Sequence, residues 1–123
     1  MIEVEENIDT FLAEAARLAL DVLASNDPYD SGLAFMGFAM REFGRDQPVN
    51  DWAAGLYLLW GSLTDGVDGP QPDPAAVAAW AVHAMRRAAA EWLALPPADT
   101  IARTEYLDRW VHEECGYERR DST

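Results

Sequence analysis

The sequence contains no lysine, because all nine of its basic residues are arginines. A P-loop phosphate site, a Schiff-base mechanism and a lysine general base all need a lysine, so these three kinds of chemistry are excluded. The chain has one cysteine, Cys115. One thiol cannot form an internal disulfide or supply the paired thiolates of a common structural zinc site, so we expect Cys115 to be reduced.

The sequence also lacks a long apolar run. Its longest stretch without a charged residue, Trp52 to Thr64, spans 13 residues, whereas a membrane-spanning helix needs about 20. The N-terminal sequence MIEVEENIDT is acidic and has neither the basic nor the apolar region of a secretory signal. We therefore expect a soluble, cytoplasmic protein that does not bind a membrane.

Acidic residues dominate the charge of the chain. There are 22 aspartates and glutamates against the nine arginines, which gives a formal net charge of −13. Nucleic acids and anionic membranes attract cationic proteins, so neither is an expected partner. Residues 1–30 alone hold eight acids and one arginine. The negative charge either keeps the protein soluble or steers it to a basic partner protein, and the composition leaves both interpretations open.

The hydrophobic residues, half of the 123, recur at helical intervals of three and four, in segments that end near glycine or proline. The pattern predicts one all-α domain over 1–123, a bundle with helices at about 7–25, 31–44, 50–64, 74–95 and 100–115. The helix at 50–64 should be central, because bulky side chains (Trp52, Leu56, Leu59, Trp60, Leu63) line one face and small ones, including Gly55 and Gly61, line another.

The predicted second helix, 31–44, has an unusually wide apolar arc. A helical wheel points Phe38 away from the arc, toward solvent, and places on one inner face Leu33, Met36, Ala39, Met40 and Phe43. Such an arc is typical of a core, but methionine and phenylalanine also make adaptable binding surfaces. One alternative for the function is therefore a structural homodimer that buries this helix.

Seven residues are candidates for binding a partner. Asp9, Glu14 and Asp21 lie on the polar face of the first predicted helix, where they would steer a basic protein. Three aromatic residues, Tyr29, Phe38 and Trp80, would anchor that partner after the first contact. Arg87 shares a helix face with Trp80, and we expect it either to stack on that ring or to join it in binding.

One stretch of the chain has the residue types of a chemical site. On the last predicted helix, which Asp99 or Thr100 would cap, one arc holds Glu105, Asp108, His112 and Cys115. Four ligands spread over more than two turns cannot all reach one ion, and the paired histidines of a zinc helix are missing. We expect a solvated face with no metal and no cofactor. A small metal- or thiol-dependent enzyme at this arc is the alternative.

The leading prediction from the sequence is a non-enzymatic acidic protein that binds other proteins, as an inhibitor or immunity protein does. Its N-terminal helix and acidic loops, of which 65–74 is the one clear loop, would dock on a basic surface of the partner. No catalytic residue is predicted.

Overall fold

The computed structural model describes residues 2–26, 28–44, 48–68, 74–96 and 99–115. Five α-helices occupy these ranges: α1 (Ile2–Ala24), α2 (Tyr29–Glu42), α3 (Val49–Asp68), α4 (Pro74–Ala94) and α5 (Thr100–Asp108). A π-helical segment, η1 (Arg109–Glu114), continues α5 without a break. No strand occurs among the described residues, and the prediction of an all-α bundle is confirmed. No helix in them is long and apolar enough to cross a membrane.

Two helix boundaries differ from the predicted ones. α2 begins at Tyr29, two residues before the start predicted for the second helix, because the Gly32 amide already donates to the carbonyl of Pro28 at 2.7 Å. α3 runs on to Asp68, so Asp65 and Asp68 belong to a helix and not to the loop predicted at 65–74. The rest of that loop, 69–73, lies outside the described residues.

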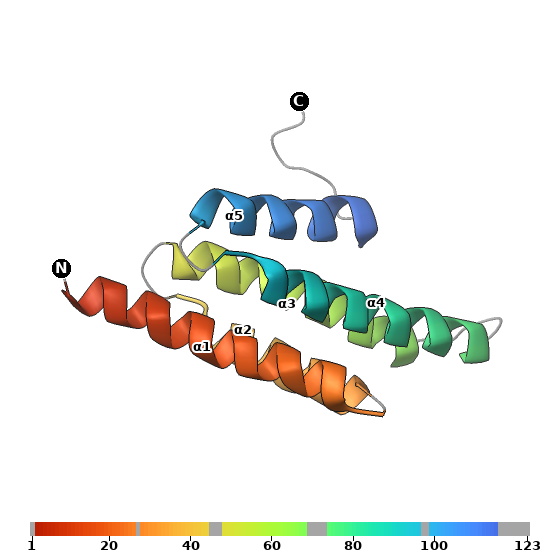
Figure 1. Ribbon diagram of the computed structural model, residues 1–123. Helices are drawn as coiled ribbons and strands as arrows, with labels where there is room; N and C mark the ends of the chain where they lie inside the picture. The colour runs from red at the N-terminus through yellow and green to blue at the C-terminus, as the bar shows by residue number, and fades with distance from the viewer. Residues whose placement is uncertain (1, 27, 45–47, 69–73, 97–98, 116–123) are drawn as a thin grey trace.

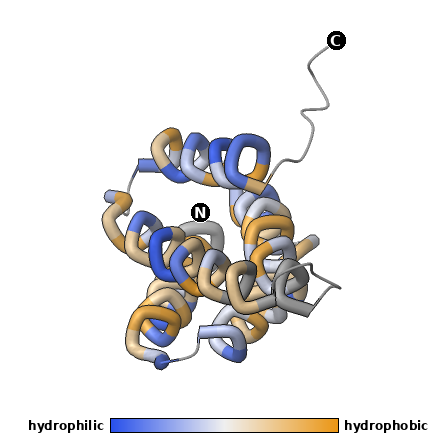
Figure 2. Tube along the Cα trace, turned by 90° about the vertical axis from the view of Figure 1, so that its right-hand side faces the viewer, coloured by the Kyte–Doolittle hydropathy of each residue, from blue (hydrophilic) through white to orange (hydrophobic). Residues whose placement is uncertain are grey.

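The helices are arranged in three tiers around α3 (Figure 1). α1 and α2 form one outer tier, α3 and α4 the middle, and α5 with η1 the opposite outer tier. α3 packs against all the others, which confirms its central position. Figure 2 looks nearly along the bundle and shows hydrophobic and hydrophilic residues on every helix. The outer helices therefore present one face to the core and another to solvent, whereas α3 exposes only Asp51 and Tyr57 among residues 49–64.

The core is rich in aromatic residues. The five bulky side chains predicted to line α3 are all buried, so this face is confirmed. Phe35 of α2 stacks on Trp60, with the ring centroids 4.8 Å apart and the planes at 14°. The small face of α3 is used at Gly55, where an added Cβ would lie 3.1 Å from Cδ1 of Leu107 in α5. Gly61 faces a different neighbour, the Met36 side chain of α2.

The orientation predicted for α2 is wrong. Phe38 is 4% exposed, with its ring centroid 5.2 Å from that of Phe11 in α1. Met40 and Phe43, which were expected to face inward, are 57% and 61% exposed. The physical reason is that α2 packs against both α1 and α3. A wheel drawn for one helix cannot tell which part of a wide apolar arc two neighbours will cover.

Candidate functional site

An open groove of about 700 Å³ lies between the last turns of α4 and the flank of α5 and η1. Its lining includes apolar surface from Ala94, Leu95 and Ala102, and the buried ring of Tyr106. Four carboxylates and one guanidinium also line it, a formal charge of −3, from Glu91, Glu105, Asp108, Glu113 and Arg109. We call this feature the acidic groove. Apolar surface beside carboxylates suits a cationic side chain with an aliphatic stem.

Glu91 of α4 joins the two walls of the acidic groove. Its Oε1 accepts hydrogen bonds from Nη2 of Arg109 at 2.5 Å and from the indole Nε1 of Trp110 at 3.0 Å. Its Oε2 lies 3.3 Å from Nε of Arg87. The Arg87 guanidinium also pairs with Glu114 and lies over the Trp110 ring, 4.6 Å from the centroid. This network fixes η1 against α4.

The charge of Glu91 is set by opposing effects. Partial burial raises the pKa of its carboxyl, but the hydrogen bonds from Arg109 and Trp110 and the positive charges of Arg109 and Arg87 outweigh burial. The pKa of Glu91 therefore lies below its usual range, and the residue is ionised at neutral pH. Glu91 acts mainly as a structural acceptor inside the groove wall.

The position of α5 depends on two further hydrogen bonds. Asp99 caps the helix, with its Oδ1 accepting from the Ala102 amide at 2.9 Å, as its residue type predicts. The buried hydroxyl of Tyr106 donates to the carbonyl of Ala88 in α4 at 2.6 Å. Because that hydroxyl is buried, its pKa is raised and it remains protonated. The α5 wall of the groove is thus fixed at its start and its middle.

The π-helical turn of η1 had no signal in the sequence. The Cys115 amide donates to the carbonyl of Trp110, five residues earlier, at 2.8 Å. In the wider turn Trp110 and Val111 are both buried although they are neighbours in sequence. The turn brings the Trp110 indole to Glu91 and its ring under Arg87. Single π-turns occur frequently at functional sites, and this one forms an end of the acidic groove.

The four residues of the predicted chemical arc do not gather at one point. Glu105 and Asp108 line the acidic groove. The Nε2 atom of His112 lies 3.6 Å from Oδ1 of Asp108. Cys115 is half-buried and lies next to Ser62 of α3. Burial raises the pKa of its thiol, and the hydrogen bond with Ser62 lowers it in part. Across the described part of the chain, no three His, Cys, Asp or Glu residues are placed to hold a metal ion.

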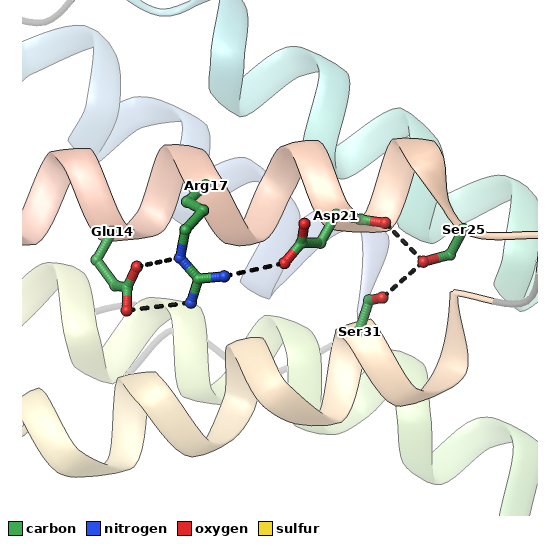
Figure 3. Close-up of polar contacts among 5 residues, drawn as sticks. All are labelled: Glu14, Arg17, Asp21, Ser25 and Ser31. Atoms are coloured by element: carbon green, nitrogen blue, oxygen red, sulfur yellow. Dashed lines mark hydrogen bonds and ion pairs between the residues drawn. The ribbon is translucent and has the colours of Figure 1, made fainter.

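The predicted steering acids of α1 lie close to an arginine of the same helix (Figure 3). Nε of Arg17 donates to Oε1 of Glu14 at 2.6 Å, and its Nη1 donates to Oδ2 of Asp21 at 3.2 Å. The hydrogen bond from Arg17 is the main reason that the pKa of Glu14 is lowered. Asp9 is exposed one to two turns earlier. Arg17 therefore offsets one of the three negative charges predicted to steer a partner, and Asp9, Glu14, Arg17 and Asp21 together keep a formal charge of −2.

The predicted aromatic anchors differ in exposure. Trp80 is 52% exposed on α4, and Tyr29 is half-buried at the first residue of α2. Phe38 lies in the core and offers no surface to a partner. The expected stacking of Arg87 on Trp80 is wrong, because Arg87 lies over Trp110 of η1 instead. That contact joins residues 23 positions apart, beyond the reach of a wheel for one helix.

Comparisons with protein-family models, with curated proteins and with solved structures gave no match. The geometry of the acidic groove is therefore the basis for assigning a function. Its ionisable groups are carboxylates, one guanidinium and the Tyr106 phenol, which is already hydrogen-bonded to Ala88. These groups suit recognition of positive charge.

Proposed function

We propose that this protein is a non-enzymatic binding protein of the inhibitor or immunity type, which docks its acidic groove on a basic segment of a partner protein. The observation that carries the proposal is the lining of the groove, where apolar surface from Ala94, Leu95 and Ala102 lies beside four carboxylates. Arginine and lysine side chains have the same two-part character, an apolar stem and a charged head. A segment with such side chains is the complementary ligand.

Long-range electrostatics favour the same class of partner. A net charge of −13 attracts a basic protein during diffusion and repels an acidic one. The attraction between exposed charges fades beyond a Debye length of about 8 Å at physiological salt. Binding through the acidic groove should therefore weaken as salt is added, mainly through a slower association rate.

The walls of the acidic groove are held in place by the network of Glu91 on one side and the Tyr106 hydrogen bond on the other. A preformed site loses less conformational freedom when its ligand binds. Glu105, by contrast, is exposed and can adjust to the position of a cationic group. A fixed wall with an adjustable acid at its edge suits a site that accepts a protruding basic side chain.

The test compares two variants of equal charge. The groove variant is Glu105→Gln/Asp108→Asn/Glu113→Gln, and the helix variant is Asp9→Asn/Glu14→Gln/Asp21→Asn. An end-blocked Arg-Leu-Arg peptide serves as the probe, titrated at low and physiological salt. Each exposed ion pair contributes about 0.2–1 kcal/mol, so the groove variant should lose roughly tenfold in affinity. The helix variant should lose less than about threefold.

Two outcomes would contradict the proposal. Equal losses in both variants would show that bulk charge attracts the peptide and that the groove adds nothing. A loss confined to the helix variant would place the binding surface on α1, as the sequence first predicted. Circular dichroism of both variants provides the control for folding.

A further inference from the structure

The outer edge of α2 carries a second apolar stripe, separate from the one that packs in the core. Met40 and Phe43 are 57% and 61% exposed, and Leu33 and Met36 are half-buried. These four residues are spaced three and four apart, so they follow one line along α2, which Phe43 continues as the C-cap after Glu42. The apolar residues of α2 therefore form two faces. One packs against α1 and α3, and the other is exposed.

α3 extends this stripe sideways. The helices run antiparallel: Gly32 lies against Trp60 and Thr64, Met36 against Gly61, and the Gly44 amide donates to Oδ1 of Asn50 at 2.7 Å. The same register places Met40 beside Tyr57, which is 42% exposed. By this register Met40, Phe43 and Tyr57, each exposed, would form one patch on the outer seam between α2 and α3.

Gly37 leaves room over the middle of the stripe. A Cβ at this position would meet only Nη1 of Arg41, at 3.6 Å, among neighbouring atoms within 4 Å. The glycine lies between Leu33 and Met40, so another helix can approach the α2 backbone closely there once the exposed Arg41 side chain turns aside. An antiparallel crossing of two α2 helices at Gly37 would place Met40 and Phe43 of each copy against the other copy.

We infer that the α2–α3 seam is the interface of a homodimer. The charge distribution selects a second copy over a basic partner: residues 31–64 hold three acids and two arginines, whereas the whole chain carries −13. Two strongly acidic chains repel least where their surfaces are nearly neutral. A basic partner would instead be drawn to the acidic groove, which is lined by α4, α5 and η1 and by no described residue of α2 or α3. A dimer through the seam leaves that groove open.

The size of the patch indicates a weak dimer. Its three half-exposed side chains offer on the order of 300 Å², and a standard interface buries about 800 Å² per partner. Added salt should strengthen the dimer, because salt screens the repulsion between two acidic chains and favours apolar burial. Binding at the acidic groove should respond to salt in the opposite direction. The two proposals can therefore fail independently.

The experiment is sedimentation equilibrium of the full chain from roughly 10 µM to 1 mM, the range of a weak complex, at low and high salt. The seam variant is Met40→Ser/Phe43→Ser, and the matched control is Trp80→Ser/Ile101→Ser, which removes exposed apolar side chains from other helices. We expect the wild type and the control to dimerise, more strongly at high salt, and the seam variant to associate at least about tenfold more weakly.

A crosslink locates the interface independently of these substitutions. In a Cys115→Ser background, Gly37→Cys, at the crossing point of the two α2 helices, should form an intermolecular disulfide under mild oxidation and Trp80→Cys should not. A wild-type chain that stays monomeric over the whole range would overturn the inference. So would a dimer that is lost in the control variant and kept in the seam variant, or a crosslink through position 80 alone.

Discussion

The rings of Phe38 in α2 and Phe11 in α1 lie 5.2 Å apart, and both are buried. Phe11 also lies 6.1 Å from Trp52 of α3, and Phe38 lies 6.3 Å from Phe35. Rings at these separations interact favourably beyond their burial. The cluster connects three helices, so α2 is oriented by its contacts with two neighbours at once.

Phe38→Ser should therefore destabilise the protein strongly. The change removes a buried ring and leaves a cavity with a hydroxyl in it, at a cost of about 3–5 kcal/mol in the free energy of unfolding. The matched change Phe43→Ser, at a residue 61% exposed, should cost less than about 0.5 kcal/mol. Urea denaturation of both variants measures the difference. A larger loss for Phe43→Ser would mean that α2 is turned the other way.

Two glycines should respond in opposite ways to alanine. At Gly37 an added Cβ meets only Nη1 of Arg41 at 3.6 Å, so Gly37→Ala should stabilise α2 by about 0.5–1 kcal/mol. At Gly55 three atoms of Leu107 would lie 3.1–3.3 Å from the new Cβ. Overpacking there should cancel the gain or exceed it. Thermal unfolding of the two variants measures the change in stability. An equal increase in melting temperature for both would show that α5 does not approach α3 closely.

Glu91→Gln should destabilise the protein in a pH-dependent way. The folded state lowers the pKa of this carboxyl below its usual 4.5, so its contribution is present above about pH 4.5 and is lost as the pH falls through the folded pKa. Because the side chain is about one third exposed, we expect a cost of about 1 kcal/mol at pH 7. The wild type and the variant should converge once the pH falls below the folded pKa of Glu91. A difference that stays constant from pH 7 to 3 would contradict the ion-pair network.

Cys115 should react slowly, and the fold should not depend on a metal. Burial raises the pKa of the Cys115 thiol, so little reactive thiolate forms at pH 7. Iodoacetamide should modify it at least about tenfold more slowly than a short cysteine peptide.

A chelator should leave the melting temperature of the protein unchanged. Fast alkylation or a chelator-sensitive melting temperature would favour the alternative of a thiol- or metal-dependent enzyme.

Sequence-based prediction is most accurate for features that depend on the residues of a single helix. The bulky face of α3 is buried as expected, because Trp52, Leu59 and Trp60 can be covered only in the interior. Asp99 caps α5, as its short side chain and position predict. For these features local spacing and residue type are sufficient.

Prediction fails where the structure depends on contacts between distant segments. The direction of Phe38 is set jointly by α1 and α3, and the partner of Arg87 lies on η1. The π-turn changes the spacing along the last helix, so the arc drawn from Glu105 to Cys115 does not persist. The acidic groove needs α4 and α5 side by side, and periodicity within one helix contains no information on that pairing.

The most direct test of the proposed function is to locate the contact of the basic probe. Backbone amide chemical shifts of the isotope-labelled protein are followed while the end-blocked Arg-Leu-Arg peptide is added at low salt. The proposal predicts that the largest changes fall on the groove segments, residues 91–95 and 102–113, and that they reverse when salt is raised. Changes centred on α1, or spread evenly over all exposed acids, would contradict it.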